Sequence, residues 1–441
     1  MPDDLAGWLS YIERLHTKPI AMGLDRVKQI IDRIQLTPNY PIITVAGTNG
    51  KGSTCAMLEK IYSEAGYRVG CYTSPHLLHY NERVRVNGNE VSDKELCAAF
   101  SAIEAARLDT DDVPIALTYF EIGTLAAVWH FMQADIDVAI LEIGLGGRLD
   151  AVNAFEPNCA IVTSVDLDHQ DFLGDTREKI GFEKAGVYRQ SVPAICGEAN
   201  PPDSLIAHAK QIQANFKCIH QDFSYQSNLE TANADAWQYL SEGKLVYTLP
   251  LPALAGNFQL NNAASAIAAV ESLQYCLPVT IGSIANALRQ VALAGRFQTV
   301  SMSPWVILDV AHNPHAANAL SGNLKAIQSQ KPGKTFAVFA MLADKDIEGV
   351  VSAVKDDIDA WYIANIDHAR GALAADLLAV IKKVAPSALV KVFSVAEAAY
   401  SQACHDIEAC IDDGENDKIV VFGSFFTVSS VMQLLSDDSK S

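Results

Sequence analysis

The stretch PIITVAGTNGKGST, Pro41–Thr54, decides the fold of this chain. It opens with an apolar run rich in β-branched residues, which predicts a buried strand over Pro41–Ala46. Glycines, a lysine and two hydroxyl residues follow, and the apolar residues of Ser53–Gly66 recur on one helical face. A strand, a glycine-rich turn and a helix in this order are typical of a phosphate-binding loop, in which backbone N–H groups and the helix N-terminus hold the phosphates.

The loop departs from the usual pattern G-x-x-x-x-G-K-[ST]. Val45 stands in place of the first glycine, and Gly52 is inserted after Lys51. Lys51 would still reach the outer phosphates, and the hydroxyl of Ser53 or Thr54 could give an oxygen to Mg²⁺. The alternative is a glycine-rich turn that binds no ligand, which would leave the lysine and the hydroxyls without a purpose.

Strand and helix patterns alternate along the whole chain and break once, around Leu293–Ser303. This predicts an α/β fold with two domains. Residues 1–295 would form an N-terminal P-loop-type domain with a mainly parallel sheet, and residues 296–441 a smaller, Rossmann-like α/β domain. Between Glu198 and Leu251 the pattern is irregular and predicts a peripheral meander of helices and short strands. The other predicted strands are Tyr67–Tyr72, Asp137–Ile143, Asn158–Val165, Trp305–Val310, Thr335–Met341, Ala360–Asn365, Leu389–Val395 and Lys418–Ser424.

The composition limits the partners and the compartment. The 441 residues carry 33 basic and 52 acidic side chains, a net charge of −19. Broad contact with nucleic acid or an anionic membrane is therefore not expected. No apolar window approaches the length of a membrane span. The nine cysteines are odd in number and form no CxxC, which argues against a disulfide framework and predicts a soluble protein of the reducing cytoplasm.

Three further stretches carry polar residues that could be functional. Glu142 ends an apolar strand, where it could hold Mg²⁺ or be a solvated residue in a capped turn. The aspartate-rich stretch Ser164–Thr176 could include a metal ligand or be a polar loop that caps a helix, and its His169 is an unusual ligand for Mg²⁺. Lys184 fits most simply as a solvated lysine on a helix.

Polar residues also gather at other predicted turns. Asn262 precedes a helix, and Arg296 lies at the domain boundary. Asp309 and His312 lie at the end of the first strand of the second domain, either as a site or as part of an Asn-Pro turn that caps the next helix. The stretch Thr73–Gly88 could be an anion-binding loop or an exposed hairpin.

Taken in order, these motifs resemble the folylpolyglutamate synthase family of Mur-type ligases, and most of all its bifunctional dihydrofolate synthase/folylpolyglutamate synthase members. The resemblance implies an ATP-dependent ligase that adds L-glutamate to dihydropteroate and to the terminal γ-carboxylate of tetrahydrofolate through an acyl phosphate. It also implies two Mg²⁺ sites and a monomer. The blocks that carry it span nearly the whole chain: GTNGKGS, SPHLLHYNERVRVNG, TYFEIGTLAA, LEIGLGGRLDAVN, DHQDFLGDT, EKAGV, GRFQ, DVAHNPHA, MLADKD and VVFGSFFTV.

The same resemblance implies roles for single residues. Lys51, Lys184 and His169 would be catalytic, with Lys184 carbamylated. ATP would be bound by Gly47, Thr48, Asn49, Gly50, Lys51, Gly52, Ser53, Asn262, Arg296, Asp309 and His312. Mg²⁺ would be held by Ser53, Ser74, Glu142, His169 and carbamylated Lys184. The folate substrate would contact Pro19, Ile20, Ala21, Met22, Arg83, Phe120, Glu121, Ile122, Gly123, Leu149, Asp150 and Ala151. Glutamate would bind near His312 and Ser424.

Two other functions are compatible with parts of this pattern. A Mur-type ligase acting on a cell-wall nucleotide precursor would keep ATP and the acyl phosphate. However, the loop begins near residue 47, which leaves no room before it for a domain that holds a UDP-sugar. A P-loop switch protein would bind nucleotide without ligating anything, and it would not need the DVAHNPHA cluster.

Overall fold

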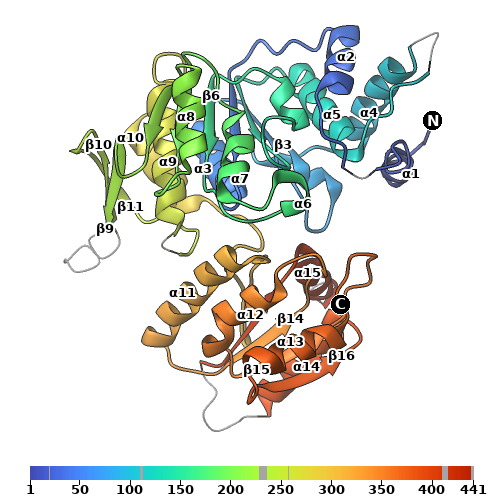
Figure 1. Cartoon of the computed structure of the whole chain (residues 1–441), viewed down its shortest axis with the longest axis vertical. Coiled ribbons are helices and arrows are strands. Elements are labelled where there is room, and N and C mark those ends of the chain that lie inside the picture. The colour runs from blue at the N-terminus through green and yellow to red at the C-terminus, as the bar shows by residue number, and fades with distance from the viewer. Residues whose placement is uncertain (19, 110–112, 228–235, 257, 410–415, 439–441) are drawn as a thin grey trace. The chain divides into compact units, whose positions relative to one another are not determined.

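The computed structural model describes residues 1–18, 20–109, 113–227, 236–256, 258–409 and 416–438. It divides into two compact units, Met1–Ala253 with Gln259–Val291, and Leu254–Phe258 with Ala292–Ser441. Each unit is built on its own sheet of mainly parallel strands (Figure 1). The predicted α/β fold with two sheet domains is confirmed, while the boundary at residue 295 stays a prediction.

The first unit holds an eight-stranded sheet of order β4-β3-β2-β5-β1-β6-β7-β8. Its main strands pair in parallel, and β3 and β4 form an antiparallel hairpin at one edge. The four strands predicted here are confirmed to within a few residues. The bounds are β1 Ile42–Ala46, β2 Val69–Tyr72, β3 Val84–Val86, β4 Asn89–Glu90, β5 Val138–Glu142, β6 Cys159–Val162, β7 Pro193–Cys196 and β8 Asn215–Cys218.

Strand β1 is central because it pairs with β5 on one side and β6 on the other. In the register, Val45 lies beside Glu142 and Ala46 beside Val162. All five residues of β1 are buried, as expected for a parallel strand covered on both faces. The carboxyl ends of these three strands therefore meet at one edge of the sheet, which is where open α/β sheets bind ligands.

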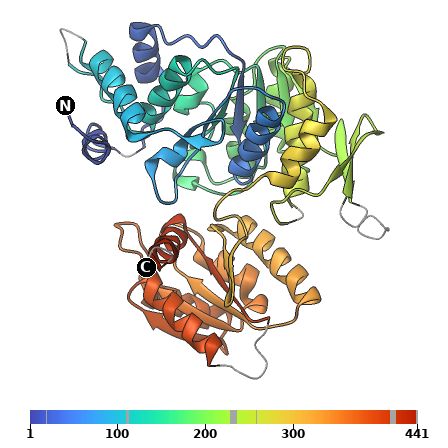
Figure 2. The ribbon, with the colours of Figure 1, turned by 180° about the vertical axis from the view of Figure 1, so that it is seen from behind.

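Helices flank this sheet, and a smaller sheet lies beside them. The small sheet is antiparallel and lies beside α10 in both views (Figures 1 and 2). It belongs to the stretch predicted as a peripheral meander. The helices are α1 Leu5–Ile12, α2 Asp25–Ile34, α3 Lys51–Glu64, α4 Asp93–Leu108, α5 Tyr119–Gln133, α6 Gln170–Leu173, α7 Arg177–Ala185, α8 Asp203–Gln211, α9 Phe258–Ser272 and α10 Ile281–Gln290, with 3-10 turns η1 Tyr80–Arg83 and η2 Ala151–Ala154; the small sheet holds β9 Phe223–Ser227, β10 Ala236–Ser241 and β11 Lys244–Pro250.

The second unit holds a six-stranded sheet of order β12-β13-β17-β14-β15-β16. The five strands predicted here are confirmed, but the predicted break at Leu293–Ser303 contains a further strand, β12. It pairs antiparallel with β13 and is largely exposed, so it lacks the apolar pattern that reveals a buried strand. The bounds are β12 Gln298–Met302, β13 Trp305–Leu308, β14 Thr335–Phe339, β15 Ala360–Ala364, β16 Leu389–Phe393, β17 Lys418–Phe422, α11 Pro314–Gln330, α12 Ile347–Val354, η3 Lys355–Asp357, α13 Ala374–Val384, α14 Ala396–Glu408 and α15 Phe425–Asp438.

The described part of the chain shows neither a disulfide nor a helix that could cross a membrane. The eight cysteines that the structure describes are free thiols, and five of them are buried. A buried free cysteine packs as a small apolar side chain. Within the described ranges, no helix combines the length and the apolar character that crossing a membrane requires.

Candidate functional site

The predicted phosphate-binding loop connects β1 to α3 and is braced by the residues after β6. The Thr48 amide donates to Ser164 O at 2.9 Å, and the Asn49 amide donates to Ser164 Oγ at 2.9 Å. Thr163 Oγ1 donates to Asn49 O at 2.6 Å. Thr163 and Ser164 were not predicted as site residues. The sequence placed both within the predicted strand Asn158–Val165, whereas β6 ends at Val162 and leaves them in the loop that follows.

Lys51 begins α3 and folds back over its own loop. Its Nζ donates to Gly47 O at 3.1 Å and to Thr48 O at 3.2 Å. The two hydroxyl residues that follow are buried, Ser53 at 1% exposure and Thr54 at 0%. Thr54 Oγ1 has no hydrogen-bond partner in the described part of the chain. A lysine held by carbonyls of its own loop and an unsatisfied buried hydroxyl fit a loop built for a phosphate and a metal ion.

The first turn of α9 packs on this loop. Asn262 is 6% exposed, and its Nδ2 donates to Gln259 Oε1 at 2.9 Å. Gln259 is fully buried and donates to Ser53 Oγ at 3.3 Å. Asn262, which was predicted to meet the nucleotide, therefore lies at the loop. Gln259 was missed, because an amide in an alanine-rich helix gives no local sign of a site.

Gly50 should not tolerate a side chain. Its φ is +86°, and an added Cβ would lie 2.5 Å from Asn262 Oδ1. We expect Gly50→Ala to lower the free energy of unfolding by about 3 kcal/mol, from left-handed strain and overpacking together. Nucleotide affinity should fall as well, because the loop must move.

The matched control is Gly66→Ala. Gly66 has a φ of +93° but nothing within 4 Å of an added Cβ, so only the backbone strain applies, at about 1 kcal/mol. Urea denaturation and nucleotide titration of both variants test the difference. Equal losses of stability in the two variants would contradict the proposed contact with Asn262.

Glu142 and Ser74 lie together at the carboxyl edge of the sheet. Glu142 is 4% exposed, and its Oε2 accepts from the Ser74 amide at 3.0 Å. The alternative of a solvated glutamate in a capped turn is therefore wrong. His169 follows β6 with a φ of +51°, and its Nε2 lies 3.9 Å from Asp168 Oδ2. Among the described residues, no three His, Cys, Asp or Glu side chains group closely enough to hold a metal ion by themselves.

Lys184 is buried at the end of α7. It is 3% exposed, so the expectation of a solvated helix lysine is wrong. Burial and then the nearby charge of Lys51 lower its pKa to about 7, against the opposite effect of Asp168 and Asp150. An amine must be neutral to react with CO₂, and this environment favours the neutral form. The site thus fits the expected carbamate.

The loop after β5 explains why Lys184 is enclosed. An added Cβ at Gly147 would lie 2.7 Å from Glu183 O and 2.9 Å from Lys184 O, so only glycine allows this approach. Asn153 is 5% exposed, and its Nδ2 donates to Arg148 O and Gly186 O, both at 3.0 Å. The loop that follows β5 in the LEIGLGGRLDAVN stretch therefore packs against the end of α7 and hydrogen-bonds to it.

The segments predicted to bind the folate substrate converge, although Pro19 lies outside the described residues. The Gly23 amide, next to Ile20, Ala21 and Met22, donates to Leu149 O at 3.3 Å. The Phe120 ring lies against Gly144, 2.6 Å from the position of an added Cβ, and 5.9 Å from the Tyr72 ring. Ile122 and Ala151 are buried, and Gly123 leaves space that the Tyr80 hydroxyl occupies.

Asp150 is a buried carboxylate between these segments. It is 5% exposed and accepts from the Leu145 amide at 2.9 Å and the Val152 amide at 3.0 Å. Burial raises its pKa to about 7, although both hydrogen bonds and Lys51 act in the opposite direction. A carboxyl group with this pKa can hold or release a proton near neutral pH.

The stretch Thr73–Gly88 contains β3 and the turn that leads to β4, and the turn residues Asn87 and Gly88 both have positive φ. Before it, Arg83 Nε donates to His76 Nδ1 at 2.8 Å. The guanidinium lies 5.2 Å from the Tyr80 ring centroid and 5.5 Å from that of Tyr119. Burial, then Arg83, lowers the His76 pKa to about 4, so this nitrogen stays an acceptor at neutral pH. Arg83 is therefore a fixed cation.

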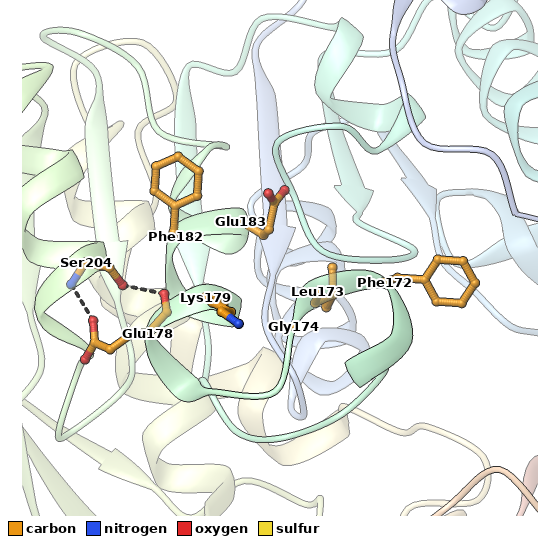
Figure 3. A pocket seen from close by; sticks show the side chains of 8 residues that line it. All are labelled: Phe172, Leu173, Gly174, Glu178, Lys179, Phe182, Glu183 and Ser204. Atoms are coloured by element: carbon orange, nitrogen blue, oxygen red, sulfur yellow. Dashed lines mark hydrogen bonds between the residues drawn. The ribbon is translucent and has the colours of Figure 1, made fainter.

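A pocket of about 530 Å³ lies beside α6 and α7 (Figure 3). Ser204 is one of the lining residues and is held by Glu178, whose Oε2 accepts from its amide at 2.8 Å and whose carbonyl accepts from its hydroxyl at 2.7 Å. Leu173 also reaches Gly146 in the loop after β5. None of the predicted site residues is among the eight described residues that line this pocket, which are Phe172, Leu173, Gly174, Glu178, Lys179, Phe182, Glu183 and Ser204.

In the second unit, Arg296 and His312 gather around Phe425. The Arg296 guanidinium lies 5.3 Å from the Phe425 ring centroid, and the His312 ring lies 6.2 Å from it. Asp309 is 8% exposed and accepts from the Phe297 and Ala311 amides at 2.9 and 2.8 Å. Burial raises its pKa to about 6, and the charge of Arg296 opposes this.

Two neighbours of this cluster have structural partners. Asn313 caps α11 through its Oδ1, which accepts from the Ala316 amide at 2.9 Å. Ser424 is 3% exposed, and its Oγ lies 2.7 Å from Thr427 Oγ1. The Asn-Pro cap and the polar cluster are thus both present, so the two alternatives for this stretch do not exclude each other.

Known proteins resemble this chain over its whole length. The Mur ligase middle domain matches residues 45–270, and the glutamate ligase domain of Mur ligases matches residues 295–425. The dihydrofolate synthase/folylpolyglutamate synthase of Escherichia coli is 44% identical over 98% of this chain and 95% of its own length. The enzyme of the same name from Haemophilus influenzae is 38% identical over 96% of each chain.

Solved structures agree with the sequence comparisons. Escherichia coli FolC in complex with DHPP and ADP has a TM-score of 0.89 at 43% identity and covers 100% of both chains. A bifunctional folylpolyglutamate synthase/dihydrofolate synthase with Mn, AMPPNP and L-glutamate bound has a TM-score of 0.86 at 42% identity and covers 98% of both chains. The predicted family is confirmed: the chain belongs to the dihydrofolate synthase/folylpolyglutamate synthase family of Mur ligases.

Proposed function

We propose that this chain is an ATP-dependent ligase that adds L-glutamate to dihydropteroate and to the terminal γ-carboxylate of tetrahydrofolate. One observation carries the proposal: in a member of this family, a phosphate-binding loop with Lys51 lies at the carboxyl edge of the sheet, where Glu142 ends the neighbouring strand. Lys184 is buried, and the positive charge of Lys51 lies close enough to contribute to the lowering of its pKa.

The reaction needs a carboxylate to become an acylating group. The γ-phosphoryl group of ATP is transferred to a carboxylate oxygen, which gives an acyl phosphate and ADP. The amine of glutamate attacks the carbonyl carbon, and the tetrahedral intermediate releases phosphate and a proton. Lys51 would leave the carbonyls of Gly47 and Thr48. Together with the loop amides, it would then stabilise the negative charge on the phosphoryl group during its transfer.

Magnesium would be held at two sites beside this loop by Ser53, Ser74, Glu142, His169 and the Lys184 carbamate, and would neutralise charge that develops on the phosphates. The neutral Lys184 amine would attack CO₂ and lose a proton, which gives a carbamate anion with hard oxygen ligands. Buried Glu142, the unsatisfied Thr54 hydroxyl and the lowered pKa of Lys184 support this assignment.

The substrates are assigned to the remaining predicted residues. Gly47–Ser53, Asn262, Arg296, Asp309 and His312 would bind ATP. The folate would lie against Ile20–Met22, Phe120–Gly123, Leu149–Ala151 and Arg83, and glutamate near His312 and Ser424. The protein would act as a monomer in the cytoplasm.

Release of ADP with one component omitted at a time tests the function. We expect release that requires glutamate, Mg²⁺ and either dihydropteroate or tetrahydrofolate. A ligase of cell-wall precursors would release no ADP when either dihydropteroate or tetrahydrofolate is supplied as the acceptor. A nucleotide switch would hydrolyse ATP at the same rate with and without them. Either result would overturn the proposal.

A further inference from the structure

Arg26, on α2, joins two segments that come from distant parts of the sequence. Its Nη2 donates to Glu121 Oε1 at 2.7 Å, and its Nε lies 3.1 and 3.3 Å from the two Glu121 oxygens. The same Nη2 donates to Ala21 O at 2.7 Å. One guanidinium therefore holds both the loop before α2 and the first turn of α5. Helix α2 lies close to α4 and α5 (Figure 1).

The Glu121 side chain is buried and held in place by its hydrogen bonds. It is 3% exposed, and its Oε2 also accepts from the Thr118 amide at 2.7 Å in the capping box that begins α5. Its carboxylate is thus committed both to Arg26 and to a helix N-terminus. This geometry argues for a structural role of the Glu121 carboxylate, so the proposed contact of Phe120–Gly123 with the folate would come from the other residues of that segment.

The loop before α2 is held at a second point. Gly23 has a φ of +131°, and its amide donates to Leu149 O at 3.3 Å. Ile20 and Met22 lie on either side of the bonded Ala21 carbonyl and stay partly exposed. Met22 Cε reaches to 3.7 Å from the position of an added Cβ at Gly146. The direction of these two side chains therefore depends on the bond from Arg26 to Ala21 O.

We infer that Arg26 is a positioning residue that fixes the loop Ile20–Gly23 against Leu149 and so sets the affinity for the folate-type acceptor. The inference rests on the proposed function. The hydrogen bonds of the Arg26 guanidinium go to Glu121 and Ala21 and, among the described residues, none goes to the loop that would hold ATP, so the affinity for ATP should not depend on it. If Arg26 positions this loop, its replacement should change the affinity for the acceptor but not the affinity for ATP. A general loss of structure would change both affinities.

Arg26→Lys is the informative variant. Lysine keeps the charge beside Glu121 but has no planar fork, so it cannot hold Glu121 and Ala21 O together. We expect the KM for dihydropteroate to rise about tenfold and the KM for ATP to stay within about twofold. Glu121→Gln, which keeps the shape but weakens the pair, should shift the same constant in the same direction.

The matched control is Arg33→Lys. Arg33 lies on the same helix and donates to Ala106 O at 2.8 Å, away from the Ile20–Gly23 loop. This variant should leave both KM values unchanged. Equal rises in the two KM values for Arg26→Lys, or an unchanged KM for dihydropteroate, would overturn the inference.

Amide hydrogen exchange of Gly23 keeps the two proposals separable. In the free protein, exchange should be faster in Arg26→Lys than in the wild type or in Arg33→Lys, because the loop is released. Failure of the wild type to release ADP with either acceptor would reject the function. An unchanged Gly23 exchange rate would reject the positioning role, whatever the activity.

Discussion

Replacing Lys51 with alanine is expected to reduce acceptor-dependent ADP release by a factor on the order of 10³ or more, while the protein stays folded. The ammonium group is the positive charge that the loop itself carries, and the reaction develops negative charge on the transferred phosphoryl group. Among the described residues, Nζ donates to two carbonyls of its own loop, Gly47 O and Thr48 O, and to no other acceptor. Its loss should therefore cost little stability, about 1 kcal/mol.

Steady-state ADP release and thermal unfolding of the same preparations test this result. The control is Lys60→Ala, which removes a lysine from the same helix, where Nζ pairs with Glu64 at 2.7 Å. This surface pair contributes little, so Lys60→Ala should retain nearly full turnover. Near-wild-type turnover in Lys51→Ala would exclude Lys51 from the transfer step.

Lys184→Ala is expected to lose activity by about two to three orders of magnitude. Unlike Lys51, Lys184 is enclosed, with 3% of its surface exposed, so its expected contribution is the carbamate that it can form and not a direct contact with a substrate. Acetate or formate should restore part of the activity, because a small carboxylate can enter the space left by the side chain and supply the missing oxygens.

Activity measured against acetate concentration tests this prediction. The control is Lys179→Ala on the same helix, whose side chain is 62% exposed and pairs with Asp175. It should be active and indifferent to acetate. Unimpaired Lys184→Ala, or a loss that no short carboxylate relieves, would contradict the carbamate. Since the folded-state pKa of Lys184 is lowered to about 7, the neutral amine prevails above that pH, and reloading with CO₂ should slow as the pH falls below it.

The parallel strands and the phosphate-binding loop could be predicted because their signals are local. β1 and α3 follow directly from apolar runs and from glycine positions within one stretch of sequence. Strand β12 could not be predicted, because an exposed edge strand such as Gln298–Met302 has no apolar pattern. The family resemblance added the residue roles, which local patterns alone left open.

The burial of Lys184 could not be predicted from local sequence patterns. Nothing in the helix Arg177–Ala185 distinguishes Lys184 from exposed Lys179, because its burial comes from a loop that precedes it in the sequence and packs through Gly147. Arg26 and Gln259 were missed for the same reason. Each acts through contacts with residues far away in the chain, Glu121 and Ser53, and periodicity reports only which face of an element is apolar.

The bracing of Thr48 and Asn49 by Thr163 and Ser164 has a thermodynamic consequence for nucleotide capture. Because these hydrogen bonds already restrict the backbone of the loop, its conformational entropy is lost during folding and not on encounter with ATP. Association in the first unit should then resemble rigid docking, with a small change in heat capacity, and not the large change that accompanies folding of a disordered segment around its ligand.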